Sequence, residues 1–145
     1  MSTKRRKPVG PHPVEVAVAN AAWAKLMDTA ELQLYGGWEG SKILETTMSL
    51  LYVVGLAAHR SGVQAPELRI IAGSCRTALD CISTGRITGQ QRETLGSGLA
   101  AARRLKPLVK GPHFVAASIE ASLLIRSRGV NWSDFQEFTD PAPKP

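Results

Sequence analysis

The chain has 145 residues and a net charge of +6; 21% of its residues are charged and 43% are hydrophobic. This is the size and composition of one globular domain that buries a core without disulfide or metal staples. The two cysteines, Cys75 and Cys81, lie on different faces of a helical pattern and too far apart to form a disulfide. Because no apolar segment follows the basic N-terminus, the sequence predicts no signal peptide and a reducing, cytoplasmic setting.

Positive charge is concentrated in two places. The basic arm holds four cations near the N-terminus: Lys4, Arg5, Arg6 and Lys7. The basic cluster lies between Cys81 and Ile119, where the only acid is Glu93, and holds six: Arg86, Arg92, Arg103, Arg104, Lys106 and Lys110. This asymmetry predicts an acidic partner, either an acidic protein surface or nucleic acid. The alternative, that each of these residues belongs to a solvated face, stays open.

The N-terminal part of the chain predicts an arm followed by a helix. Residues 1–12 combine the charge run with proline and glycine, which is typical of a flexible segment. Pro13 suits the first turn of a helix that runs to about Leu34. Apolar residues recur there at three- and four-residue steps, so we expect one face to point inward: Val16, Ala19, Trp23, Leu26, Ala30 and Leu34.

A central buried helix is predicted over residues 41–60, with Ser41 as its N-cap and Gly62 as its stop. Residues 46–58 carry no charge and are apolar nearly all round, which indicates a helix covered on every side. The run is too short for a membrane span, which needs roughly 20 apolar residues, so we expect no membrane association. Gly55 costs about 1 kcal/mol in a helix unless a neighbouring helix approaches it closely.

A helical hairpin is predicted next. Pro66 opens a third helix that ends at Gly85, and Thr88 with Gln91 forms a capping box that starts a fourth helix, limited by Pro107. The third helix should bury Leu68, Ile71, Ala72, Cys75, Leu79 and Ile82, and the fourth Leu95, Leu99 and Ala102.

A fifth helix is predicted over residues 111–127, with Gly129 as its stop. Its small residues would let it pack against the Gly55 region. A short helical turn within 131–138 carries Trp132, Phe135 and Phe138, and residues 139–145 form a tail. The predicted fold class is therefore all-α: a single-domain bundle over residues 13–138, with about five main helices, a buried central helix and a short C-terminal helix.

No pattern for catalysis or metal binding emerges. The three histidines, His12, His59 and His113, stand in separate segments, and the cysteines lack a zinc-type spacing. A cysteine nucleophile with a distant histidine is conceivable, but buried structural thiols are the commoner outcome for such positions. The acids form no recognisable acid/base pair. We therefore predict no enzyme, no cofactor and no metal.

The segment 77–101, Thr-Ala-Leu-Asp-Cys-Ile-Ser-Thr-Gly-Arg-Ile-Thr-Gly-Gln-Gln-Arg-Glu-Thr-Leu-Gly-Ser-Gly-Leu-Ala-Ala, carries one resemblance. Its helix, Thr-Gly turn and Leu-Ala-Ala-rich helix resemble small uncharacterised helical proteins of proteobacterial prophages and plasmids. The resemblance covers about a sixth of the chain and supplies no catalytic residues. It implies an accessory protein of a mobile element, a class that often regulates or inhibits a host system.

Two functions follow from these features. The first is a non-enzymatic helical protein that binds and modulates a host protein complex through an acidic surface of that complex. The alternative is contact with the nucleic-acid phosphate backbone through the basic arm and the basic cluster. The cations are not interleaved with aromatic residues, as a single-strand stacking platform requires. They also gather at the C-terminal end of the fourth helix rather than at the N-terminal end that reads bases. These patterns favour the first function.

Overall fold

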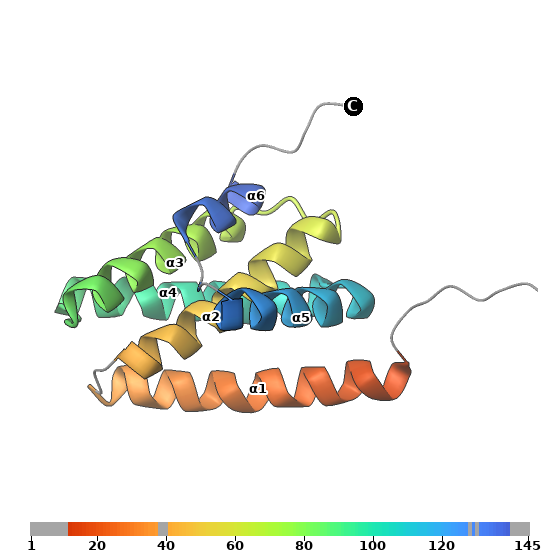
Figure 1. Cartoon of the computed structure of the whole chain (residues 1–145), viewed down its shortest axis with the longest axis horizontal. Coiled ribbons are helices and arrows are strands. Elements are labelled where there is room, and N and C mark those ends of the chain that lie inside the picture. Colours follow the sequence, from red (N-terminus) through yellow and green to blue (C-terminus); the bar gives the residue numbers. More distant parts are fainter. Residues whose placement is uncertain (1–11, 38–40, 128, 130, 140–145) are drawn as a thin grey trace, which may run out of the picture.

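The computed structural model describes residues 12–37, 41–127, 129 and 131–139, and these form a single-domain helical bundle (Figure 1). The predicted fold class is confirmed. The helices and 3₁₀ turns are α1 (Pro13–Tyr35), α2 (Ser41–Arg60), α3 (Glu67–Thr84), α4 (Gly89–Leu105), η1 (Lys106–Leu108), α5 (Gly111–Ser127), η2 (Trp132–Phe135) and α6 (Gln136–Thr139). The basic arm and residues 140–145 lie outside the described residues.

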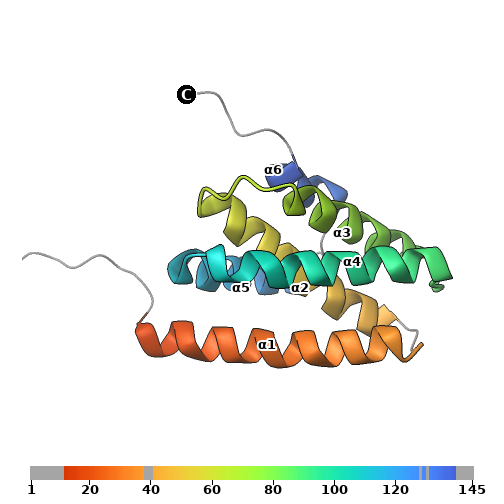
Figure 2. The ribbon, with the colours of Figure 1, turned by 180° about the vertical axis from the view of Figure 1, so that it is seen from behind.

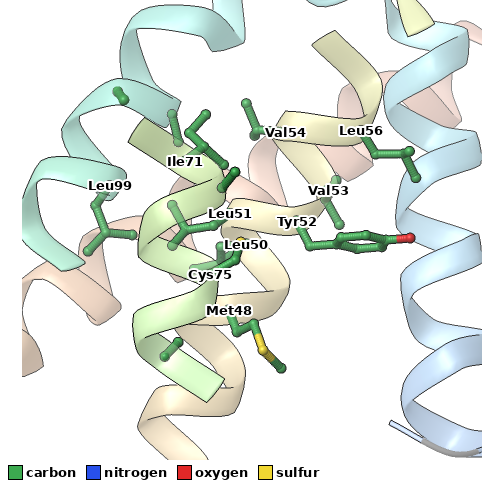
Figure 3. Close-up of a cluster of buried hydrophobic side chains, with 14 of the residues drawn as sticks. Met48, Leu50, Leu51, Tyr52, Val53, Val54, Leu56, Ile71, Cys75 and Leu99 are labelled. Atoms are coloured by element: carbon green, nitrogen blue, oxygen red, sulfur yellow. The ribbon is translucent and has the colours of Figure 1, made fainter. Parts of the chain in front are cut away.

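Helix α2 is the centre of the bundle, and every residue from Leu50 to Ala58 is buried. Helix α5 covers α2 on the side facing the viewer in Figure 1, and α4 crosses its opposite side in Figure 2. Figure 3 shows Leu51 and Val54 on the side of α2 that faces Ile71, Cys75 and Leu99, with Tyr52 pointing the opposite way. The predicted central helix is confirmed. No helix in the described part of the chain has the length and apolarity needed to cross a membrane.

Small residues bring α3 and α4 together. A side chain at Gly98 would collide with the Cβ and hydroxyl of Ser74, so the two backbones approach closely at this level. The Ser74 hydroxyl donates to the backbone carbonyl of Thr94 at 2.8 Å, which satisfies its buried oxygen. A side chain at Gly96 would meet the Tyr35 hydroxyl at 2.6 Å. Gly98 therefore allows close packing of α3 and α4, and Gly96 leaves room for the side chain of Tyr35 at the end of α1.

Gly55 serves a close approach as expected, but not from the expected neighbour. A Cβ there would lie 2.7 Å from the ring of Phe138, so the C-terminal segment rather than α5 requires the glycine. Phe138 packs near Tyr52 and Phe135, whose rings lie about 6 Å from one another. Arg60 then ties this segment to the bundle, because its guanidinium bridges Glu137 at 2.8 Å and Glu120 of α5 at 2.9 Å.

The buried face of α1 differs from the predicted one at its centre. Trp23, Ala30 and Leu34 are buried as expected, but Met27 takes the inward position and Leu26 is 46% exposed. Val16 and Ala19 are only partly buried. The prediction was wrong at Leu26 because apolar residues lie on several faces of this helix, so periodicity alone does not fix which face turns inward.

Helix termini follow the sequence signals with two adjustments. The capping box at Thr88 and Gln91 is present, with reciprocal bonds of 3.1 and 2.9 Å. Gly62, Gly85 and Gly129 have the positive φ of helix stops. Pro66 is the N-cap of α3 rather than its first helical residue, and Ser41 is already helical instead of preceding α2. In α3, Leu79 and Ile82 are only partly buried, whereas Cys81 is fully buried.

We predict that Gly98→Ala lowers the free energy of unfolding by roughly 1–3 kcal/mol, because the added methyl group overpacks the α3–α4 contact. The matched control is Gly73→Ala on the exposed side of α3, where a Cβ meets nothing within 4 Å. This control should gain about 0.5–1 kcal/mol from helix propensity alone. Denaturant unfolding of both variants is the measurement, and equal gains would contradict the close approach.

Candidate functional site

An apolar hollow opens to solvent between α1 and α5, with α2 as its floor. Its volume is about 230 Å³, and it is lined by Ala19, Ala22, Trp23, Leu26, Ser49, Leu50, Val53, Ser118 and Ser122. The indole N–H of Trp23 donates to the carbonyl of Leu50 at 3.4 Å, so the ring presents its apolar surface to the hollow. The volume is below the range of about 300–1,000 Å³ typical of small-molecule sites, and suits one or two side chains of a partner.

Two close contacts between α1 and α5 border the hollow. They run in the same direction (Figure 1), and a Cβ at Gly111 would lie 2.8 Å from the Val16 side chain. The rings of Trp23 and Phe114 then meet edge to face at 6.3 Å. Beyond that contact α5 offers only the small side chains of Ser118 and Ser122 toward α1, so the space between the helices stays open.

The hollow continues across α5 as a shallower depression. Ser118 and Ser122 line both, and the depression adds Ile119, Leu123 and Arg126. Ile119 and Leu123 are 57% and 58% exposed, and Leu26 stands on the α1 side. We call the hollow and this depression together the α1–α5 groove. Contiguous exposed apolar surface of this kind marks an interaction site more often than isolated exposed side chains do.

One cation, Arg126, lines the groove, and Lys25 stands on a neighbouring face of α1. Lys25 is exposed beside Leu26, one helical turn after Ala22, and Arg126 lines the depression on α5. In the part of the chain that the structure describes, neither side chain forms an ion pair. Glu15, also on α1, accepts a bond from the backbone N–H of His12 at 2.7 Å as part of the helix cap. The groove therefore combines an apolar lining with a single lining cation, Arg126.

A second hollow of about 360 Å³ lies between α2, α3 and the end of α5, lined by Glu45, Met48, Leu79, Ile82, Ile125 and Gly129. Its edge reaches Gly129, between positions 128 and 130, which the structure does not describe. Among the residues lining this second hollow, Ile125 is the one exposed large apolar side chain, whereas the α1–α5 groove has three: Leu26, Ile119 and Leu123.

The arginines of the basic cluster at the end of α4 are used within the fold. The Arg103 guanidinium donates two hydrogen bonds, of 2.9 and 2.6 Å, to the carboxylate of Glu31 in α1 and forms an ion pair with Asp28 at 2.6 Å. These bonds raise the pKa of the Arg103 guanidinium above its ordinary value, chiefly through Glu31. Arg104 bridges Glu67 of α3 at 3.3 Å. Their charge is therefore largely compensated inside the protein.

Two further members of the basic cluster support the α1 interface. The Lys106 ammonium donates to the side chain of Asn20 at 2.7 Å and lies 4.3 Å from the Phe114 ring centroid, a cation–π arrangement. Burial lowers the pKa of Lys106. Arg92 donates to the carbonyl of Leu34 at 2.7 Å, at the C-terminal end of α1, where a cation suits the helix dipole.

The remaining cluster members, Arg86 and Lys110, are exposed but do not form one surface. Arg86 precedes α4 and Lys110 follows it, so the length of that helix, about 25 Å at 1.5 Å per residue, separates them. The structure thus divides the six predicted partner-binding residues into four that hold helices together and two at opposite ends of α4. The arm residues Lys4, Arg5, Arg6 and Lys7 lie outside the described part of the chain.

The thiols and histidines do not form a reactive group. Cys75 and Cys81 are fully buried in α3, and burial raises the pKa of both thiols. In the described residues no three His, Cys, Asp or Glu side chains come together as metal ligands. His12 instead caps α1, with its ring nitrogen accepting from the backbone N–H of Val14 at 3.1 Å.

Sequence reasoning missed the groove, although a signal for it exists. Helix α5 has a single charged residue, Glu120, between Phe114 and Ile125, and a helix that is apolar on nearly every face is normally covered all round. Within the described fold α2 is covered, whereas α1 and α5 expose Val18, Leu26, Ile119 and Leu123. An apolar helix at the bundle's edge could therefore have pointed to a contact surface.

We predict that Arg103→Gln lowers the free energy of unfolding by about 1 kcal/mol, because it removes the ion pairs between α4 and two carboxylates of α1. The loss should shrink as salt is raised, since these groups are partly exposed. Lys110→Gln is the matched control and should change stability by less than about 0.5 kcal/mol. Equal effects in the two variants would show that the Arg103 network does not contribute.

We predict that neither cysteine of the native protein reacts with a chromogenic disulfide reagent within minutes at neutral pH. Their raised pKa values suppress the thiolate, and burial denies the reagent access. Both thiols should react at once in concentrated guanidinium. A fast-reacting thiol in the native state would instead indicate an accessible, activated cysteine.

Comparison with known proteins gives no relative: no protein-family model, no curated protein and no solved structure matches the chain.

Proposed function

We propose that the protein is a non-enzymatic helical binding protein, an accessory protein of a phage or other mobile element that binds and modulates a host protein complex. The observation that carries this proposal is the α1–α5 groove, an apolar surface open to solvent with one cation, Arg126, in its lining. Mobile-element context comes from the resemblance of segment 77–101 alone.

The exposed apolar side chains supply the energy for such binding. Fully burying a Leu or Ile side chain contributes roughly 1.5–3 kcal/mol, so covering the half-exposed Leu26, Ile119 and Leu123 contributes a few kcal/mol. Only part of that gain becomes affinity, because association costs translational and side-chain freedom. This is enough for these residues to act as the anchors of a larger interface.

Binding to nucleic acid receives less support from the structure. Phosphate contact needs cations free to replace counterions. Arg103 and Arg104 are paired with carboxylates, and Lys106 is held by Asn20 and two aromatic rings. A phosphate-binding surface would have to rely on Arg86, Lys110 and the basic arm.

The test is affinity capture from nuclease-treated host lysate, with the captured proteins identified by mass spectrometry. We expect capture to survive nuclease and to fall at least about tenfold with Leu26→Asp, which places a charge in the groove. The matched control is Leu32→Asp, the same change on the same helix at a 76% exposed position that does not line the groove. Thermal melts should show both variants folded.

Two outcomes would contradict the proposal. Capture that nuclease abolishes would favour the nucleic-acid alternative, and neutralising Arg86 and Lys110 should then flatten the dependence of affinity on salt. Capture that Leu26→Asp and Leu32→Asp reduce equally would remove the groove from the interface.

A further inference from the structure

We propose that the surface of α2 and α3 beneath residues 131–139 is a docking site for a short protein segment of the form Phe-x-Glu-Phe. The chain's own segment of this form occupies the site as a detachable strap, which opens and recloses while the rest of the bundle stays folded. In both Figure 1 and Figure 2, α6 lies on the opposite side of the bundle from α1. The site is therefore separate from the α1–α5 groove and does not depend on it.

The strap, residues 131–139, has the length of a bound peptide rather than of a self-supporting element. Its two helical turns, η2 and α6, have four residues each. Isolated helices shorter than about 12–15 residues are marginal in water, so the strap owes its shape to the surface that it contacts. Helices α2 and α3 provide that surface. The strap therefore folds onto the bundle as a short peptide folds on binding its receptor.

Two phenylalanine side chains anchor the strap. Phe135 and Phe138 are 0% and 3% exposed, and each ring centroid lies 6.1 Å from that of Tyr52. The ring of Phe138 also lies over Gly55, where a Cβ would come within 2.7 Å of it. The missing side chain at Gly55 thus leaves the space on α2 that receives Phe138. Such buried aromatic anchors are typical of peptide and protein interfaces.

An ion pair fixes the orientation of the strap. The Arg60 guanidinium donates to the carboxylate of Glu137 at 2.8 and 3.0 Å, a bidentate arrangement. The same guanidinium donates to Glu120 of α5 at 2.9 and 3.2 Å. Because Glu120 belongs to the bundle, it holds Arg60 in place when the strap leaves. The open site therefore keeps a positioned cation for an incoming carboxylate.

The contacts that hold the strap are few for the number of residues that it orders. Of its described side chains, only those of Phe135 and Phe138 are buried. Their burial and the ion pair with Arg60 oppose the lost backbone freedom of nine residues. Helices α3 and α4, in contrast, bury side chains in every turn. Segments with few buried contacts open at lower free energy than the core does, so the strap should open first.

The occupant observed in the site indicates the chemistry of its replacement. Opening uncovers Tyr52 and Gly55 next to Arg60, an apolar surface with one cation at its edge. Two phenylalanines three residues apart match the apolar part, and an acidic residue between them matches the cation. A lysine at the position of Glu137 would meet like charge at Arg60.

The replacement comes from a different protein rather than from a second copy. A strap attached to its own site acts at an effective concentration of about millimolar. The identical segment of a second copy makes the same contacts without that advantage, so it does not displace the strap at lower concentrations. A segment of another protein that adds contacts of its own does displace it.

Hydrogen exchange of the full chain, followed by mass spectrometry, tests the opening. Gly55→Ala places a methyl group where the Phe138 ring lies, and we expect exchange within 131–139 to rise at least about tenfold with α3 and α4 unchanged. The matched control is Gly73→Ala, the same change at a helical glycine where a Cβ meets nothing within 4 Å. It should leave exchange in the strap as in the wild type.

A second pair of variants tests the ion pair. Glu137→Gln should raise exchange within 131–139 at low salt, and the wild type should approach it as salt is raised. Glu45→Gln, at an exposed position near the other end of α2, is the matched control and should behave as the wild type.

Binding in trans tests the docking site. The probe is a fluorescein-labelled synthetic peptide of residues 131–139, measured by fluorescence anisotropy against the full chain. We expect it to bind Phe138→Ser at least about tenfold more tightly than the wild type, because that variant's own strap competes less. Peptides carrying Phe138→Ala or Glu137→Lys should bind Phe138→Ser at least about tenfold more weakly than the unaltered peptide.

Four results would overturn the inference. The first is exchange in the strap that occurs only together with α3 and α4, and the second is loss of the whole fold in Phe138→Ser by circular dichroism. Either would make the strap part of the core. The third is absence of peptide binding to a folded Phe138→Ser. The fourth is a wild-type dimer in light scattering that Phe138→Ser dissociates, because a second copy would then occupy the site. None of these measurements involves the α1–α5 groove, so their failure leaves the proposed function unaffected.

Discussion

The need to cover α2 on every side determines the arrangement of the bundle. From Leu50 to Ala58 this helix has no face that tolerates water, so each of the other long helices and the C-terminal segment packs against it. Figure 3 shows the result on two sides at once: Leu51 points toward Ile71 and Leu99, while Tyr52 points toward the C-terminal part of the chain. Helices that pack against a central helix need not cover each other. Apolar surface on α1 and α5 therefore remains exposed at the edge of the bundle.

The contrast between two helix pairs explains where this surface opens. Between α3 and α4, Gly98 and Ser74 remove the side-chain volume that would hold the backbones apart, so the helices close on each other. Between α1 and α5, Gly111 allows a similar approach at Val16, but farther along α5 the residues that line the hollow are the small Ser118 and Ser122. Small residues thus allow close packing between α3 and α4 but leave a groove between α1 and α5. The difference is whether the facing helix fills the space that the small residues leave.

The charged residues also divide into those paired within the fold and those that remain available to a partner. Arg103 and Arg60 each hold two carboxylates from other segments, and these networks fix α1 and the C-terminal segment to the body. The bonds from Arg60 keep the pKa of the Glu137 carboxyl below its ordinary value. The positive charge that remains for a partner is smaller than the sequence total implies. At the groove it comes from Arg126, which is not a member of a dense cationic run.

The sequence by itself determined the elements of this protein. Local signals at Pro13, Thr88 and Gly129 indicated helix ends, and the uncharged run in α2 identified the core. Both kinds of signal depend only on residues that lie close together in the sequence. Tertiary structure alone decided that Leu26 faces outward, that Phe138 fills the space at Gly55, and that Arg103 is paired with Glu31. Each of these depends on contacts between residues distant in the sequence, and periodicity cannot supply them. A charge count likewise cannot distinguish a cation that binds a partner from one that binds the protein's own carboxylates.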